Sequence, residues 1–234
     1  MIMTLADYMR GLSHLFFPNT CTGCDQPLGS NEDLVCTDCW YHMPYTDFHL
    51  QADNDTARQL WGRVKVDAAA SFLFFREASR VQRIMHYFKY RNTPRIGVLM
   101  GLRYGELLRY ATGFASVDLV VPVPLHPKKL RERGYNQSAY FAEGLAQSLG
   151  KPMLPSALAR KTAGESQTHK SRYERYQNMQ DTFQVNEPGA LAHRHVLLVD
   201  DVLTTGATIE ACAQALLACE GVRVSVATIA RAVS

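Results

Sequence analysis

Three stretches of the chain are almost continuously apolar: residues 68–75, 117–124 and 196–199. Runs of this length predict strands that are buried on both faces, as in a parallel sheet. Apolar residues three or four positions apart lie between and after these runs, which is the pattern of amphipathic helices. Helices that alternate with buried strands predict an α/β domain with a mainly parallel sheet flanked by helices.

The predicted helices have clear boundaries. One ends near residues 89–92, a second extends from residue 95 to about residue 111, and a third covers residues 136–149. In the third helix, Asn136 is placed to cap the first turn and Gly150 to stop the last turn.

The first 60 residues have a different pattern. Apolar residues from Leu5 to Phe16 follow one helical face and predict an amphipathic helix that ends near Pro18. Residues 46–60 contain several Asp and Asn residues and predict a polar linker. We therefore expect a small N-terminal module over residues 1–45 and a larger α/β domain over residues 60–234.

Composition agrees with an intracellular globular protein. The 234 residues are 47% hydrophobic and 20% charged, which excludes disorder and leaves enough chain for one large core and a small module. No basic, signal-like segment opens the sequence, and charged residues interrupt its apolar stretches, so we expect neither export nor a membrane span. A net charge of +3 does not by itself indicate a polyanionic partner.

Four cysteines form two Cys-x₂-Cys pairs, which are Cys21 with Cys24 and Cys36 with Cys39. Gly23 is expected to permit a left-handed residue in the first turn. A disulfide framework is the alternative, but no secretory signal supports it, and redox catalysis would need only one reactive pair. Two matched pairs predict a closed four-thiolate site for a structural Zn²⁺, which folds this segment and takes no part in catalysis.

The third apolar run leads into the residues that say most about chemistry. It ends in two carboxylates, Asp200 and Asp201, followed by a loop rich in hydroxyls and a further helical pattern. A strand–loop–helix junction presents backbone N–H groups and a positive helix end to a phosphate dianion. Carboxylates beside it fit a ligand with vicinal hydroxyls, such as ribose 5-phosphate. An ordinary polar turn is the alternative, and the length of the pattern disfavours it.

Residues 196–208 resemble the phosphoribosyl pyrophosphate (PRPP) signature of type I phosphoribosyltransferases. The resemblance implies that Asp200 and Asp201 hold the ribose 2′- and 3′-hydroxyls. It also implies that PRPP binds together with magnesium. The loop that would hold the 5′-phosphate consists of Thr204, Thr205, Gly206, Ala207 and Thr208. One departure from the signature is Thr204. Purine-salvage members commonly have an aspartate at this position that acts as a base, and a threonine hydroxyl cannot act as a base near neutral pH.

Basic residues gather directly after the second apolar run. The loop expected there carries four cations and two amides: Lys128, Lys129, Arg131, Arg133, Asn136 and Gln137. In an open α/β sheet, ligands bind at the carboxyl ends of the strands, so this loop is expected opposite the phosphate loop, where pyrophosphate or a DNA backbone would lie. A solvated charged turn is the alternative.

The chain as a whole resembles the ComF family of competence-associated proteins. The resemblance rests on the four-cysteine module, the Val-Pro-Val-Pro strand before residue 125, residues 133–137, Lys89-Tyr90 and the PRPP signature. It implies a type I phosphoribosyltransferase-like domain with an N-terminal zinc module. It also implies a cytoplasmic bacterial protein that handles transforming single-stranded DNA, with DNA-uptake proteins of the inner membrane as partners.

Residues 160–180 mix cations with tyrosines and amides. In transferases of this fold, a mobile loop in this part of the chain closes over pyrophosphate. The same residue types bind single strands through phosphate contacts and stacking, and a polar surface loop is the third interpretation. The candidate residues of this basic loop are Arg160, Gln167, Arg172 and Arg175.

Two functional classes stay open from the sequence. One is a DNA-uptake protein that keeps a pocket for PRPP or a related ribose phosphate and binds single-stranded DNA. The other is an active phosphoribosyltransferase that acts on an unidentified nucleobase-like acceptor. Thr204 favours the DNA-uptake protein, and the intact acidic pair keeps the active transferase as an open alternative.

Overall fold

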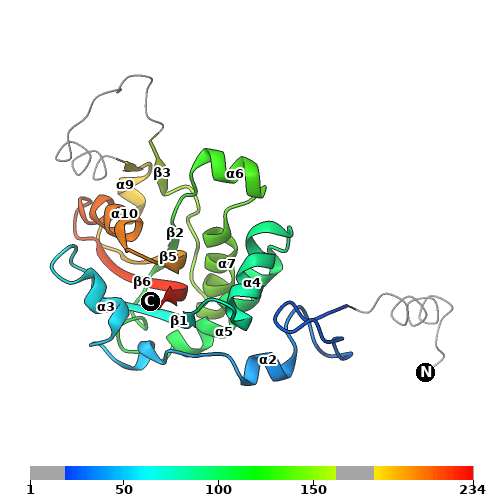
Figure 1. The fold of residues 1–234 in the computed structure, drawn as a ribbon. Helices are drawn as coiled ribbons and strands as arrows, with labels where there is room; N and C mark the ends of the chain where they lie inside the picture. Colours follow the sequence, from blue (N-terminus) through cyan, green and yellow to red (C-terminus); the bar gives the residue numbers. More distant parts are fainter. Residues whose placement is uncertain (1–18, 162–181, 234) are drawn as a thin grey trace, which may run out of the picture.

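The computed structural model describes residues 19–161 and 182–233 (Figure 1). The helix expected before Pro18 lies outside these residues, as do Gln167, Arg172 and Arg175 of the basic loop.

The central sheet has four strands in the order β1-β6-β5-β2, and every neighbouring pair is parallel. These strands are β1 (Ala68–Phe75), β2 (Leu119–Pro122), β5 (His195–Leu203) and β6 (Arg223–Ala232). A separate antiparallel pair consists of β3 (Leu158–Arg160) and β4 (Phe183–Val185). The prediction of an α/β fold with a mainly parallel sheet is confirmed.

Helices cover both faces of this sheet (Figure 1). One face packs against α4 (Arg80–Tyr90), α5 (Arg95–Leu108) and α7 (Gln137–Leu149). The other face packs against α3 (Asp55–Leu60) and α10 (Ala207–Leu217). The shorter helices are α2 (Thr37–Tyr41), η1 (Phe48–Leu50), α6 (Pro127–Arg133) and α9 (Pro188–Leu191).

The apolar run of β5 explains how one strand holds the two layers together. Val196 and Leu198 belong to the core under α3 and α10, while Leu197 and Val199 belong to the core under α5 and α7. All four side chains are fully buried. A strand whose successive side chains point to opposite, equally buried faces must be apolar at every position, as this run is.

Three details differ from the sequence expectations. Residues 46–60 are no linker, because they contain η1 and α3, and Asn54 caps α3 by accepting hydrogen bonds from two of its amides. The strand does not stop before the acidic pair, since β5 pairs with β6 as far as Leu203. The basic segment after β2 is the helix α6, with His126 as its N-cap and Gly134 in the left-handed conformation at its C-terminal end. The helices α3 and α6 form where the sequence predicted a linker and a loop because capping side chains accept hydrogen bonds from their first amides.

No helix in residues 19–161 or 182–233 combines the length and the apolar character that a bilayer span requires.

The helices α5 and α7 approach each other through glycines. A Cβ atom on Gly144 of α7 would overlap the carbonyl oxygen of Val98 on α5, and a Cβ on Gly101 of α5 would overlap that of Phe141. Backbone therefore meets backbone at this crossing, and it places the first turn of α7 beside the end of β5.

We predict that Gly144→Ala destabilises the protein by about 2 kcal/mol or more, because the added methyl group has no space at the helix crossing. Urea unfolding gives the free energy of unfolding. Gly189→Ala on α9 is the matched control, since a Cβ there meets no atom within 4 Å. Equal stability of the two variants would contradict this packing.

Candidate functional site

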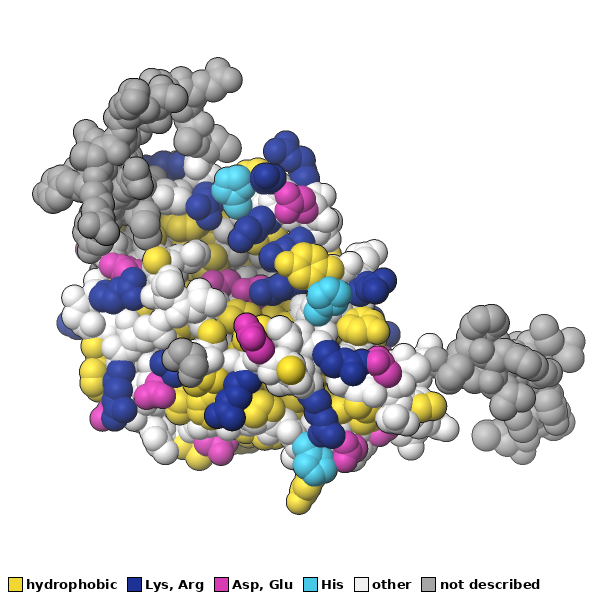
Figure 2. All heavy atoms as spheres, viewed as in Figure 1, with side chains coloured by type: hydrophobic (Ala, Val, Ile, Leu, Met, Phe, Trp, Pro, Cys, Tyr) yellow, Lys and Arg dark blue, Asp and Glu magenta, His cyan; other side chains and the backbone are white. Residues whose placement is uncertain are grey.

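A pocket of about 360 Å³ lies at the carboxyl ends of the parallel strands. The polar and charged residues that line it come from α4, α6, α7, β3, β5 and the segment that follows β5: Lys89, His126, Lys129, Arg133, Gln137, Ser138, Arg160, Asp200, Asp201, Thr204 and Thr208. Figure 2 shows Lys and Arg side chains gathered over α6 at the rim of this hollow. Residues that are far apart in the sequence therefore face one cavity.

The acidic pair lies at the floor of the pocket, on the last part of β5. Ser138 Oγ donates a hydrogen bond to Asp200 Oδ1 at 2.8 Å. Lys89 Nζ forms an ion pair with Asp201 Oδ2 at 3.0 Å. The two carboxylates thus have different partners, a hydroxyl from α7 and an ammonium group from α4.

Asp200 has an unusual pKa. Removal of its carboxyl group from water, together with the adjacent charge of Asp201, raises the pKa to about 7, against the lowering effect of the hydrogen bond from Ser138. A carboxyl group with this pKa exchanges its proton near neutral pH, and it can donate or accept a hydrogen bond at a ligand hydroxyl.

The predicted phosphate loop, residues 204–208, encloses a second and smaller pocket of about 30 Å³ that adjoins Asp200. Gly206 has a φ of +77°, which a residue with a side chain rarely adopts, and it is the N-cap residue of α10. Ala207 and Thr208 already form the first turn of α10. The positive end of α10 therefore faces a space that a group of a few atoms would fill.

The structure divides the predicted basic residues into two groups. Lys129, Arg133 and Arg160 line the large pocket, whereas Lys128 and Arg131 are exposed and do not line it. Gln137 also lines the pocket, and its side-chain oxygen accepts a hydrogen bond from Arg133 at 2.9 Å.

Asn136 stabilises the backbone beside the pocket. Its side chain accepts a hydrogen bond from the amide of Ser138 and donates one to the carbonyl of Val123. This residue joins the end of the β2 segment to the start of α7.

Three polar lining residues were absent from the sequence-based site: Lys89, His126 and Ser138. Ser138 follows the capping residue of α7, and a hydroxyl there has no distinctive pattern. Lys89 was noted only as a position shared with the ComF family, and nothing in its local sequence shows that α4 directs it toward Asp201.

The four predicted cysteine ligands form one cluster. The Sγ atoms of Cys21, Cys24, Cys36 and Cys39 all lie within 4.8 Å of one another. The Cys24 and Cys36 Sγ atoms are 3.7 Å apart, close to the roughly 3.8 Å expected between thiolates on a tetrahedral Zn²⁺. The donor set and its spacing fit zinc.

Backbone amides support this cluster. The N–H groups of Gly23 and Cys36 donate to Cys21 Sγ at 3.4 and 3.2 Å. Gly23 is not in the left-handed conformation that we expected; Asp25, with a φ of 61°, is. Gly23 is required for space, because a Cβ there would lie 2.9 Å from the Sγ atom of Cys39.

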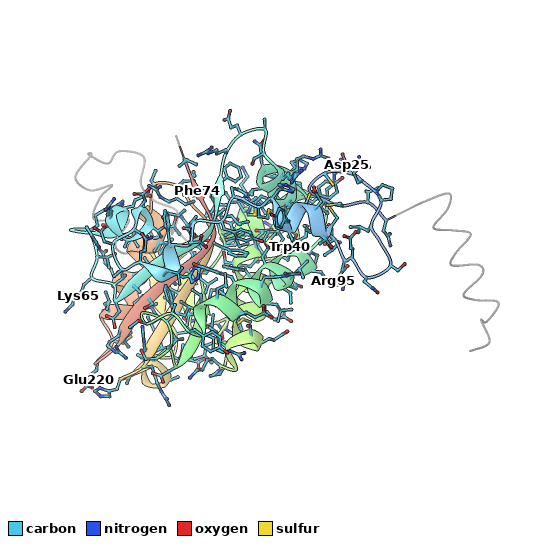
Figure 3. All side chains as sticks on the ribbon, turned by 90° about the horizontal axis from the view of Figure 1, so that it is seen from below. Asp25, Trp40, Lys65, Phe74, Arg95 and Glu220 are labelled. Atoms are coloured by element: carbon cyan, nitrogen blue, oxygen red, sulfur yellow. The ribbon has the colours of Figure 1, made fainter. Side chains whose placement is uncertain are left out.

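The cysteine segment packs against α4 and α5 and contributes to the same core as these helices. Arg80 pairs with Asp38 at 3.1 Å, and Arg95 pairs with Asp33 at 2.6 Å. Figure 3 shows Asp25, Trp40 and Arg95 together at this end of the molecule, far from Glu220.

Comparison with known proteins agrees with this architecture. Residues 136–234 match the family model of the phosphoribosyl transferase domain. The chain is 29% identical over 201 residues to the DNA utilization protein YhgH of Escherichia coli K12, covering 84% of this chain and 83% of that protein. It is 33% identical over 93 residues to competence protein F of Haemophilus influenzae, covering 39% of this chain and 41% of that protein. These similarities support a ComF-family protein. The matched residues form a phosphoribosyltransferase-like domain.

Another relative matches a shorter stretch of this chain. The DNA utilization protein YhgH of Salmonella typhi is 33% identical over 137 residues, covering 57% of this chain. The match spans 60% of the length of that relative.

Two solved structures have a more distant similarity to this chain. Glutamine phosphoribosylpyrophosphate (PRPP) amidotransferase from B. subtilis has 20% identity and a TM-score of 0.41, with 60% of this chain and 30% of that chain covered. Adenine phosphoribosyltransferase from Leishmania tarentolae has 14% identity and a TM-score of 0.38, with 81% and 94% covered.

We predict that Asp200→Asn makes the protein more stable at about pH 8, by up to about 4 kcal/mol. The folded-state pKa of Asp200 is raised to about 7, so folding takes up a proton between about pH 4 and pH 7, and wild-type stability falls as pH rises through that window. The advantage of the Asn variant should vanish near pH 4. Urea unfolding at both pH values measures it, with the exposed Asp53→Asn as control. A variant no more stable than wild type at pH 8 would contradict the assignment.

Proposed function

We propose that this ComF-family protein binds PRPP, or a related ribose 5-phosphate, in the pocket at the carboxyl ends of the strands. Asp200 and Asp201 receive the 2′- and 3′-hydroxyls, and residues 204–208 receive the 5′-phosphate. The observation that carries the proposal is the convergence of the acidic pair, Thr204, Thr208 and the cations of α6 on one cavity.

The cations define the other end of the ligand. Lys129, Arg133 and Arg160 line the pocket and would bind the pyrophosphate group through charge-assisted hydrogen bonds. PRPP would enter as its magnesium complex, since Mg²⁺ prefers phosphate and carboxylate oxygens and carries part of the pyrophosphate charge.

We also propose a role in DNA uptake, because similar proteins are named for DNA utilization and competence. In this proposal the protein handles single-stranded DNA in the cytoplasm beside the uptake proteins of the inner membrane. The exposed cations of α6 and the exposed Tyr90 support it, since Arg133 lies over the Tyr90 ring at 5.7 Å. Cations beside an exposed aromatic ring are what a single strand needs for phosphate contacts and base stacking.

The second candidate is an active phosphoribosyltransferase. The intact acidic pair favours it, while Thr204 supplies no base for a nucleobase acceptor. Release of pyrophosphate from PRPP over a panel of nucleobases distinguishes transfer from binding alone.

For the cysteine cluster we propose a structural zinc ion, held by the four thiolates of residues 21–39 in a closed site. We further propose that residues 1–45 act as the zinc module and residues 60–234 as the phosphoribosyltransferase-like domain.

The zinc proposal predicts about one zinc per chain in protein purified without added metal, because four thiolates saturate a tetrahedral ion. Cys21→Ser should lose the metal and lower the thermal stability. Cys212→Ser is the matched control, since this buried cysteine lies outside the cluster. Protein free of metal under reducing conditions would contradict the zinc site.

The ribose proposal predicts that Asp200→Asn combined with Asp201→Asn weakens PRPP binding by at least about tenfold, because each carboxylate accepts a charge-assisted hydrogen bond from a hydroxyl. Titration calorimetry with PRPP and Mg²⁺ measures the affinity. Asp53→Asn is the control on an exposed carboxylate outside the pocket. Unchanged affinity of the double variant would rule out the acidic pair as the ribose ligand.

The DNA proposal predicts sequence-independent binding of single strands that weakens steeply with salt. Replacing Lys128, Lys129, Arg131 and Arg133 with Ala should flatten the log–log salt slope by up to about three units, at roughly 0.7 for each phosphate contact. Lys65→Ala with Lys151→Ala is the control, and PRPP should compete with the DNA. A slope that the four substitutions leave unchanged would remove α6 from DNA binding.

A further inference from the structure

The segment from α3 to Arg63 lies against the phosphate loop, and α3 itself belongs to residues 46–60, for which the sequence predicted a linker. Gln59 Nε2 donates a hydrogen bond to the carbonyl of Thr204. Arg63 Nη1 donates to the carbonyl of Thr205 at 2.7 Å. Arg63 Nε also donates to Glu210 Oε2, at 2.9 Å, in the first turn of α10. One guanidinium group therefore joins the loop to the helix that follows it.

These bonds orient the peptide groups of the loop. A trans peptide group is planar, so its carbonyl and its N–H point in opposite directions. With the carbonyls of Thr204 and Thr205 held by α3 and Arg63, the N–H groups of Thr205 and Gly206 point away from that segment. Within the part of the chain that the structure describes, no protein group accepts a hydrogen bond from either amide. Two donors are therefore available to an anion.

The same guanidinium group also balances a charge. Glu210 is 9% exposed and lies one turn into α10, close to the helix end where a phosphate would bind. An unpaired carboxylate there would repel a phosphate dianion. The ion pair with Arg63 cancels this repulsion while leaving the amide donors free.

We propose that Arg63 and Gln59 are positioning residues for the phosphate of the ligand: they hold the loop in the conformation that directs its amide groups at an anion, and Arg63 neutralises Glu210. The inference rests on the proposed function, since it explains how the loop would bind the 5′-phosphate of a ribose phosphate.

Arg63→Ala should weaken the binding of ribose 5-phosphate by about tenfold or more, the change expected from losing a hydrogen bond to a charged donor. Arg63→Lys keeps the charge but cannot bridge two acceptors in the same way, so it should restore only part of the affinity. Gln59→Ala should weaken binding less, because it removes one neutral donor. Arg58→Ala is the matched control on the same segment, since among the described residues the Arg58 side chain pairs with Asp53 and Asp55 and not with the loop.

Nuclear magnetic resonance of the unliganded full chain supplies a readout that does not depend on ligand. In Arg63→Ala, the amide signals of residues 204–208 should shift or broaden by exchange, while those of the central strands stay in place. Arg58→Ala should leave both sets unchanged. This measurement also shows whether each variant is folded.

The outcomes are distinct. Unchanged loop signals and unchanged affinity in Arg63→Ala would overturn the positioning role. If Arg63→Ala changes the stability of the protein but not its affinity relative to wild type, Arg63 only stabilises the fold, and the positioning role is overturned as well. If wild type binds no ribose 5-phosphate, inorganic phosphate or PRPP, the proposed function fails, and the loop signals alone decide whether Arg63 orders the loop.

Discussion

Two adjacent carboxylates lie in the last part of β5, directly after four fully buried side chains. Burying charge there costs free energy, and several contacts of the surrounding structure reduce that cost. Asp201 meets the ammonium group of Lys89, and Asp200 accepts from the hydroxyl of Ser138. The remaining cost appears in the raised pKa of Asp200. A fold without a ligand to bind would gain stability from an apolar or amide residue at this position. The arrangement is therefore consistent with a site built at the expense of stability.

The elements around the acidic pair have complementary roles. The glycine crossing of α5 and α7 brings Ser138 to β5, and the packing of α4 against the cysteine segment supports the helix that carries Lys89. On the other face, α3 and Arg63 hold the phosphate loop. The pocket thus depends on both layers, and the cysteine cluster contributes by stabilising α4.

The sequence predicted the parts of this fold that depend on local patterns. The strand at residues 68–75 and the helix capped by Asn136 are found where the apolar pattern and the capping residues indicated. The clustering of the four cysteines also followed from their spacing. Each of these features is determined by residues close together along the chain.

The features that the sequence did not predict depend on contacts between distant segments. Asn54 made residues 46–60 seem a linker, yet its amide group caps α3 and donates to the carbonyl of Ala69 on β1. The continuation of β5 through the acidic pair depends on pairing with β6, which no local pattern shows. The contacts of Lys89 and Arg63 are likewise tertiary, so residue type and position alone could not assign them.

A crystal structure of the protein with PRPP and Mg²⁺ tests the central claim most directly. The account predicts the 5′-phosphate on the amides of residues 204–208, the ribose hydroxyls on Asp200 and Asp201, and the pyrophosphate facing Lys129 and Arg133. Lys89 should then leave Asp201 or share it with the ligand. PRPP bound at any other surface, or an empty pocket at saturating PRPP, would contradict the account.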